Sequence, residues 1–368
     1  MKRVFKSFIY ILISIFWITS CNPREEGIVV KWKNEDHVFP FKYEIEKQEA
    51  LERTWKEVHL KEIFTVNGLS DSSIFQPLTI NADDSSLYIL DATDGYVKQF
   101  DLRGNFRRNV GGGLGNGPGE FVQPFDFSMD LLGNIYVVDI GARSLVSLNE
   151  EGDFRWQKLY KHNTPGHVSV SDSNVVVSVT GVDLDHIFER YEIEGDLKGV
   201  YSKLVKNPGD SLDEQIEVFG KPFIGNVKIA DDLTIFVPRY LSQIIFYEKN
   251  GEIKNAIHTI DNATNPKLIF DRDIYHGVPG FFPIGFEGTD TNLDFSIVGN
   301  DIVIWSQQGN EKFGPHIFDI YDLKTGRYQY SAKLDLGQIS GFKMVANKIF
   351  TYNTVTTEIK GYSVNSFN

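Results

Sequence analysis

The chain has 368 residues and carries 37 basic against 50 acidic side chains. This acidic balance argues against a nucleic-acid-binding protein, because phosphate recognition requires a basic surface. The chain contains a single cysteine. Intrachain disulfides are therefore excluded, and the stability of the fold must come from packing.

The N-terminal residues have the three parts of an export signal. Three basic residues lie within the first six positions, and an apolar run follows over residues 8–18. That run is too short to cross a hydrocarbon core as a permanent helix, which takes about 20 residues. Small polar residues then lead to Cys21. The pattern predicts a signal peptide over residues 1–20.

Cys21 stands at the end of Ile18-Thr19-Ser20-Cys21, which resembles the lipobox of bacterial lipoproteins. The resemblance implies lipidation at Cys21, and a cysteine with two or more acyl chains anchors firmly to a membrane. An ordinary signal peptide with a chance cysteine is the alternative. Because this is the only cysteine of the chain, we expect the lipoprotein, located in the cell envelope at the outer membrane.

Residues 22–54 mix both charge signs and have few signals of compact structure, so they are predicted to form a tether. A flexible segment of that length spans roughly 30 Å. The acidic pair Glu25-Glu26 resembles export tags that direct some lipoproteins to the outer face of the outer membrane. Both a periplasmic and a surface-facing position remain open.

A repeated pattern begins after the tether. Two copies are clearest: LYILD at residues 87–91 with YVKQFD at 96–101, and IYVVD at 135–139 with SLVSLN at 144–149. Each is followed by a Gly-containing hairpin, and looser copies start near residues 175, 233, 302 and 348. Four short strands per unit at this spacing predict an all-β protein with propeller blades over residues 55–368.

The sixth unit ends at Tyr362, before a fourth strand can form. The β-rich segment at residues 58–66 precedes the first full unit and is predicted to supply the missing strand. Such closure of a six-bladed β-propeller by an N-terminal strand pairs edges that would otherwise stay exposed. An all-β sandwich or two small barrels are the alternatives.

Three segments carry a family resemblance: GNGPGEF at residues 115–121, Asp126-Phe127-Ser128, and GNIYVVD at 133–139. They resemble the signature of six-bladed propeller lipoproteins, which are akin to NHL-repeat and TolB-like propellers. The resemblance covers residues 55–365 and implies fold and export. Most members of the family have no assigned activity, so it implies no catalytic residue.

The connections between the predicted strands differ in length on the two faces of the ring. All the long ones fall on one face, at residues 111–120, 207–222, 261–292 and 308–315. Because long structured loops concentrate function, this loop-rich face is the predicted binding face. Its candidate binding residues are Glu120, Gln123, Arg143, Arg239, Tyr240, Asp271, Asp273, His276, Phe281, Phe282, Lys312 and His316.

The longest connection, residues 261–292, combines aromatic side chains with acids and a histidine. This mixture suits a sugar or peptide surface. The alternative is a self-packed cap whose phenylalanines cover the ring. The repeated Asp91 and Asp139 end two equivalent strands and are predicted to accept backbone N–H bonds from the following turns.

The sequence contains no cofactor motif that we can assign. The glycine-rich residues 111–117 complete neither GxGxxG nor a P-loop, so we interpret them as a crossover between blades. The eight histidines form no HExxH or HxxxH pair. We expect no cofactor, although calcium held by several blades would leave no motif.

Two readings of the function follow. The first is a membrane-anchored binding platform for a glycan, a peptide or a partner protein. The second is a metal-assisted hydrolase or lyase that uses carboxylates in a central funnel with His276 or His316. Convergence of three or more acidic or amide side chains from different blades, each about 2.5 Å from one point, would favour the enzyme.

Overall fold

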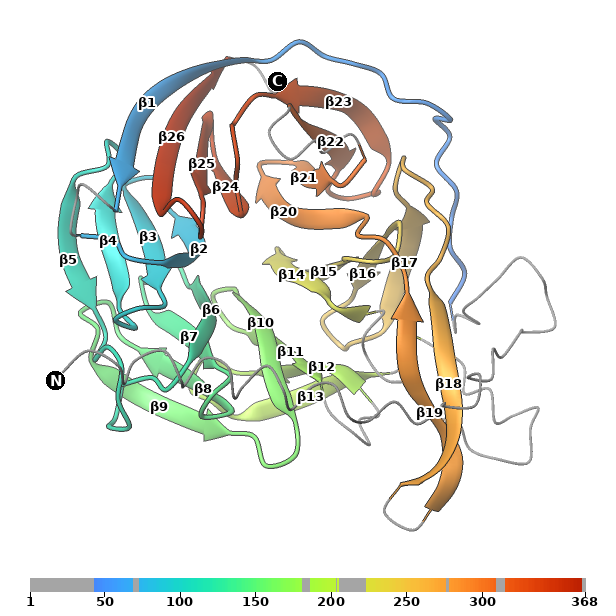
Figure 1. Ribbon diagram of the computed structural model, residues 1–368, viewed down its shortest axis with the longest axis horizontal. Coiled ribbons are helices and arrows are strands. Elements are labelled where there is room, and N and C mark those ends of the chain that lie inside the picture. Colours follow the sequence, from blue (N-terminus) through green and yellow to red (C-terminus); the bar gives the residue numbers. More distant parts are fainter. Residues whose placement is uncertain are drawn as a thin grey trace, which may run out of the picture.

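The computed structural model describes residues 43–68, 73–180, 186–202, 204, 223–275, 278–308 and 315–365. Six four-stranded antiparallel sheets stand around a common axis (Figure 1). The predicted six-bladed β-propeller is confirmed, and the sandwich and the pair of barrels are not formed. The described residues contain no helix long and apolar enough to span a membrane.

The first three blades follow one another along the chain, each with its inner strand first. Blade one comprises β2 (Pro77–Ala82), β3 (Ser86–Asp91), β4 (Val97–Asp101) and β5 (Phe106–Val110). Blade two comprises β6 (Pro124–Met129), β7 (Ile135–Asp139), β8 (Ser144–Leu148) and β9 (Phe154–Leu159). Blade three comprises β10 (Thr164–Val170), β11 (Val175–Thr180), β12 (His186–Tyr191) and β13 (Leu197–Ser202).

The second half of the ring has the same order with one addition. Blade four comprises β14 (Gly225–Ala230), β15 (Leu233–Pro238), β16 (Gln243–Tyr247) and β17 (Ile253–His258). A separate hairpin, β18 (Lys267–Tyr275) and β19 (Val278–Glu287), follows it. Blade five comprises β20 (Asn292–Val298), β21 (Asp301–Ser306), β22 (His316–Asp322) and β23 (Tyr328–Leu334). Blade six comprises β24 (Gly341–Val345), β25 (Lys348–Tyr352), β26 (Glu358–Asn365) and β1 (His59–Asn67).

The last blade is closed by a strand from the other end of the fold. β1 pairs antiparallel with β26 from His59 opposite Asn365 to Asn67 opposite Glu358. The predicted closing strand, residues 58–66, is therefore confirmed to within one residue. Its pairing leaves blade six with four strands like the others.

The hydrophobic cores lie between blades. The second strands β3 and β7 are buried along their whole length, because a neighbouring blade covers each face. One core joins Leu90 and Val97 of blade one to Val137 and Val146 of blade two. Another joins blade six to blade one through the packing of Phe350 near Ile89. The ring is thus held by apolar contacts that repeat from blade to blade.

The segment before β1 differs from its prediction. Residues 43–56 run along the outside of blades four and five (Figure 1). Glu46 bridges Ile257 of β17, and Trp55 bridges Ser331 of β23, both in parallel. The tether predicted over residues 22–54 is therefore too long, since residues 43–54 are bonded to the ring. Cys21, the signal peptide and residues 22–42 lie outside the described residues.

Side chains fasten the same segment. The Gln48 side-chain amide donates to the carbonyls of His258 (2.8 Å) and Gly326 (2.9 Å). Its oxygen accepts the N–H of Tyr328 at 3.0 Å. One glutamine thereby links blade four to blade five. Sequence patterning does not show such a role, because every partner is more than 200 residues away.

The longest connection forms the hairpin of β18 and β19, which pair with each other and with no blade. Figure 1 shows the hairpin extending away from the ring. The described backbone of β18 and β19 therefore does not form the cap over the ring that was the alternative for residues 261–292. An antiparallel hairpin satisfies its own inner backbone groups, so it does not need the ring for its hydrogen bonds.

Candidate functional site

The structure describes the side chains of six of the twelve candidate residues, and these six lie at separate places around the ring. Four candidates belong to the hairpin: β18 contains Asp271 and Asp273, and β19 contains Phe281 and Phe282. In the register of the hairpin, Asp271 pairs with Phe282. The side chains of these four residues are outside the described part. His276 and Lys312 also lie outside the described residues.

Glu120 serves its own loop. Its Oε2 accepts the N–H of Gly117 at 2.7 Å. A Cβ atom on Gly115 would lie 2.0 Å from the same carboxylate, which explains a glycine at that position. The glycine-rich crossover is closed by backbone bonds, including Gly112 N–H to the Gly119 carbonyl at 2.9 Å. Gln123 is exposed, and its N–H donates to Asp139 Oδ1 at 2.9 Å.

The remaining candidates have structural partners. Arg239 forms an ion pair with Asp290 at 2.6 Å, and Tyr240 follows it in the turn after β15. Arg143 occupies a tight turn with a positive φ of 48°, and its carbonyl accepts the N–H of Tyr160 at 2.9 Å. Each of these groups lies at a different connection of the ring.

His316 is buried inside blade five. Its Nε2 lies 2.6 Å from the Gly337 carbonyl, and its ring stands edge-on to Trp305 at 5.1 Å. Burial lowers the pKa of this imidazole, which keeps it neutral at physiological pH. The side chain is held by packing and is not presented to a central funnel.

The two repeated aspartates have the predicted role. Asp91 accepts the N–H of Thr93 in the following turn, and Asp139 accepts that of Ala142, both at 3.0 Å. Each also accepts two N–H groups from the entry into its own inner strand, for example Val122 to Asp139 at 2.6 Å. The carboxylates fix the first strand of a blade to the turn after the second.

The inner strands place two sets of equivalent side chains around the centre of the ring. One equivalent position in each inner strand forms what we call the upper layer: Thr79, Asp126, His167, Asn226, Asp294 and Gly341. Two residues further along each strand is the lower layer: Asn81, Ser128, Ser169, Lys228, Ser296 and Lys343. Neither layer has one residue type in all six blades, so the repeat pattern of the sequence does not reveal them.

The upper layer is linked in pairs across neighbouring blades. Asp126 Oδ2 lies 3.0 Å from His167 Nδ1, and the Asn226 amide donates to Asp294 Oδ1 at 3.1 Å. Although buried, Asp126 has a lowered pKa because His167 and the N–H of Val168 stabilise its anion. Burial raises the pKa of Asp294, where bonds to the carboxylate compensate less.

Blade six contributes a tyrosine to the upper layer in place of its own inner residue. A Cβ atom on Gly341 would lie 2.6 Å from the Tyr352 ring and hydroxyl. The phenol therefore occupies the space that a side chain would take at position 341. Burial, with Asp294 and Asp126 nearby, raises the pKa of Tyr352 and keeps it a neutral hydrogen-bonding group.

The lower layer has serines in blades two, three and five. Each serine hydroxyl accepts an N–H from the inner strand of the next blade: Ser128 from Val170, Ser169 from Ile229 and Ser296 from Met344, at 2.9–3.2 Å. Blades four and six have Lys228 and Lys343 at this position. An ammonium group donates only, so these two residues cannot take over the role of the serines.

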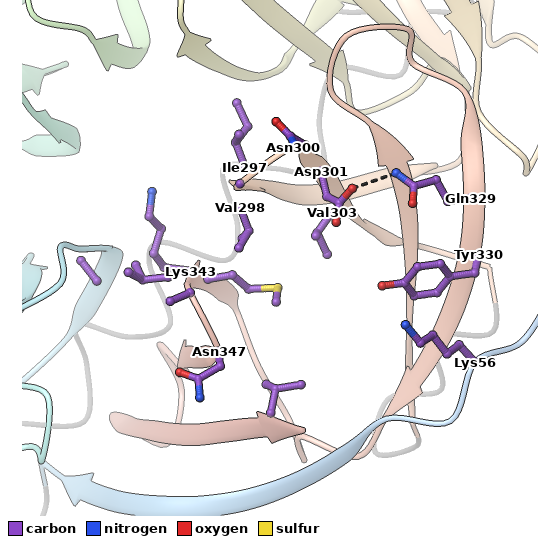
Figure 2. Close-up of a pocket in the computed structure, with 16 residues that line it drawn as sticks. Lys56, Ile297, Val298, Asn300, Asp301, Val303, Gln329, Tyr330, Lys343 and Asn347 are labelled. Atoms are coloured by element: carbon purple, nitrogen blue, oxygen red, sulfur yellow. Dashed lines mark hydrogen bonds between the residues drawn. The ribbon is translucent and has the colours of Figure 1, made fainter. Parts of the chain in front are cut away.

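A groove of about 1120 Å³ opens between blades five and six (Figure 2). Its floor is apolar and includes Val303 and Met344, both nearly inaccessible to solvent. Its polar lining consists of Lys56, Asn300, Asp301, Gln329, Tyr330, Lys343 and Asn347. The turns that line it, around residues 299–300 and 346–347, belong to the face of short turns, opposite the loop-rich face that the sequence favoured.

Two contacts fix the outer end of the groove. The Gln329 amide donates to Asp301 Oδ1 at 2.8 Å (Figure 2). The Lys56 ammonium lies 4.6 Å from the centre of the Tyr330 ring. Burial and Asp301 raise the pKa of Tyr330 to about 12, so its hydroxyl remains protonated at neutral pH. The segment before β1 thus supplies a wall of the groove through Lys56.

Among the described residues, no three His, Cys, Asp or Glu side chains come close enough to hold a metal ion. In the upper layer, Asp126 is engaged by His167 and Asp294 by Asn226, on different pairs of blades. The described part of the chain thus contains no group of three carboxylate or imidazole ligands of the kind that the metal-assisted enzyme would use.

Comparison with known proteins agrees with the fold. A family model described as a 6-bladed beta-propeller (DUF5128) matches residues 52–173, about a third of the chain. The chain is a six-bladed β-propeller. No curated protein matches the sequence.

Several solved structures share the architecture at low sequence identity. A Bacteroides fragilis protein described as exported is 13% identical, with a TM-score of 0.56 over 88% of this chain and 99% of its own. A DUF4221 family member from Bacteroides vulgatus is 9% identical, with a TM-score of 0.54 over 84% and 98%. Virginiamycin B lyase from Staphylococcus aureus is 10% identical, with a TM-score of 0.51 over 83% and 99%. These likenesses concern the fold alone.

Proposed function

We propose that this chain is a lipid-anchored protein of the cell envelope that binds an extended peptide segment of a partner in the groove between blades five and six. The groove itself is the observation that carries the proposal. It combines an apolar floor with polar groups at its rim, as ligand sites in proteins commonly do.

The chemistry of the rim favours a peptide over a glycan. The side-chain amides of Asn300 and Asn347 both donate and accept hydrogen bonds, which suits the alternating N–H and C=O groups of a peptide backbone. A sugar ring usually stacks on an open aromatic face. Tyr330 is the aromatic residue of this groove, and Lys56 lies over its ring.

The anchor remains part of the proposal. It rests on the resemblance of residues 18–21 to a lipobox and on the export signal before it. Anchoring through Cys21 would hold the ring at the membrane. Mass spectrometry of the mature chain tests this proposal, because a lipidated cysteine would appear as the N-terminal residue with its acyl mass.

Binding can be tested with the full chain in detergent. A random peptide library is selected on it, and recovered peptides are titrated against wild type and Val298→Glu, which puts a charge into the apolar lining. Leu131→Glu is the matched control, because Leu131 is 86% exposed at a turn of blade two. Groove binding predicts at least a tenfold weaker affinity for Val298→Glu and no change for Leu131→Glu. Equal affinities in all three proteins would exclude the groove.

A further inference from the structure

We propose that the centre of the ring binds a small oxyanion, phosphate or carboxylate, between Lys228 of β14 and Lys343 of β24. This site is separate from the peptide function proposed above, although Lys343 also lines the inner end of the groove.

Two lysines interrupt the pattern of serines in the lower layer. Ser128, Ser169 and Ser296 each join their blade to the next through a hydroxyl that accepts a backbone N–H. Lys228 and Lys343 occupy the equivalent positions and give up that bond. Two cations therefore replace a structural contact near the axis, where desolvation makes a charge costly.

The two ammonium groups interact with nearby carboxylates only through space, since the charge of Lys228 acts on Asp126 and Asp294 and that of Lys343 on Asp294. Neither Lys228 nor Lys343 has a hydrogen bond or ion pair within the described part of the chain. The nearby carboxylates are already engaged: Asp126 accepts from His167 and Val168, and Asp294 accepts from Asn226, Phe295 and Phe342. A bound oxyanion would supply the acceptors that the protein does not.

The charged neighbours of Lys343 act on its pKa in opposite directions. Burial and repulsion from Lys228 together lower the pKa of Lys343 to about 7, and the attraction of Asp294 opposes this shift only in part. Among these charged neighbours, repulsion outweighs attraction at the Lys343 amine. A negative charge placed there is stabilised, and by linkage it would hold Lys343 in its protonated form.

The Lys343 amine can be reached from the groove. Lys343 is only half-buried and lines a groove of about 1120 Å³. Figure 2 shows its side chain extending from β24 away from Lys56 and Tyr330. A small anion can therefore reach the amine through the groove without unfolding a blade.

The test is calorimetric titration of the full chain in detergent at pH 6.5 and constant ionic strength, with inorganic phosphate and, separately, succinate. We expect saturable binding of at least one anion, weakened at least tenfold by Lys228→Met and by Lys343→Met. Lys254→Met is the control, since Lys254 is exposed on the outer strand β17. Circular dichroism confirms that each variant is folded.

The two probes separate the sources of the oxyanion. Binding of phosphate but not succinate would assign a phosphate site, and the reverse a carboxylate site. Absence of binding by both probes would overturn the proposal. So would binding that is unchanged in both central variants, or weakened as much by Lys254→Met. Peptide binding in the groove is read out separately through Val298→Glu, so either proposal can fail without the other.

Discussion

Arg53 donates from Nε to Asp319 Oδ1 and from Nη2 to Asp319 Oδ2, each at 2.8 Å. The same guanidinium pairs with Asp261, and its Nη1 donates to Gln308 at 2.8 Å. The side chains of both aspartates are 1% exposed. A residue outside the blades therefore neutralises two carboxylates buried at the junction of blades four and five.

Arg53→Met should lower the free energy of unfolding by about 3 kcal/mol, because removing one partner leaves buried charge uncompensated. Urea denaturation of the full chain measures the loss. Arg327→Met is the control: Arg327 pairs with Glu46 on the surface, and such exposed pairs contribute about 0–1 kcal/mol. Equal losses in the two variants would contradict a special role for Arg53.

The loss in Arg53→Met should depend on pH. Burial already raises the pKa of Asp319, although Arg53 opposes the shift. Without Arg53 the folded-state pKa should rise further above the unfolded value, so the folded state takes up protons as the pH falls and gains stability. We expect the difference between wild type and variant to shrink as the pH falls from 7 toward 4. A constant difference would indicate lost packing alone.

Asp139→Ala should destabilise blade two by about 2–4 kcal/mol, because the N–H groups of Val122, Gln123 and Ala142 all lose the buried carboxylate that accepts them. Asp101→Ala removes a carboxylate that accepts comparable bonds in an exposed hairpin. Water can replace those bonds, so a loss of about 1 kcal/mol or less is expected. Unfolding midpoints in urea compare the two variants.

Gly341→Ala should destabilise blade six by about 1–3 kcal/mol, since the new methyl group would overlap Tyr352. Adding Tyr352→Ala opens the space that the methyl group needs. The loss of stability in the double variant should therefore be smaller than the sum of the losses in the two single variants. Additive losses would show that Tyr352 does not occupy the space at Gly341.

Lys343→Met should stabilise the protein at pH 6, by about 1–2 kcal/mol, and less at pH 9. The folded-state pKa of about 7 lies below the unfolded value near 10.5. Between these values the unfolded state binds more protons, so wild-type stability rises with pH. The variant lacks that slope. The charged neighbours are Lys228 and Asp294, and the upper layer adds Asp126, His167 and Tyr352. If the stability curves of wild type and variant run parallel from pH 6 to 9, the lowered pKa of Lys343 is contradicted.

Deletion of residues 267–287, with a short glycine linker between the flanking residues, should leave the ring folded. The hairpin pairs with no blade, and its end residues Lys267 and Glu287 are opposite one another. Far-ultraviolet circular dichroism and the urea midpoint measure the outcome. Loss of the cooperative transition would show that the hairpin supports the ring. If the hairpin is the recognition element considered for this segment, the folded deletion protein will fail to bind its partner.

The sequence allowed prediction of the ring and its closure because both follow from local patterns. Buried second strands such as residues 135–139 are continuous apolar runs, and the unit that stops at Tyr362 lacks one strand. The attachment of residues 43–56 could not be predicted in this way. Its bonds, such as those of Gln48 and Arg53, reach partners more than 200 residues away.

The central residues were missed for a related reason. A repeat search finds residue types that recur in every unit, whereas the upper layer has five residue types at its six positions. Lys228 and Lys343 stand out only when the strand pairing shows that they occupy the positions of Ser128, Ser169 and Ser296 in other blades. Glu120 was selected for its place before an inner strand, but the positive φ of Gly119 and the bond to Gly117 turn it back into its own loop.

The segment before β1 also determines how the molecule would carry mechanical load. If the chain is held through Cys21, a pull on the anchor meets the hydrogen bond of Tyr43 to Gln243 and the bonds between Glu46 and β17. It then meets those of Gln48 and Arg53, and only afterwards the closing strand. These contacts join blades four and five before the seam of blade six is loaded. The attachment would thus bear the load before β1 is pulled away from β26, the strand pair that closes the ring.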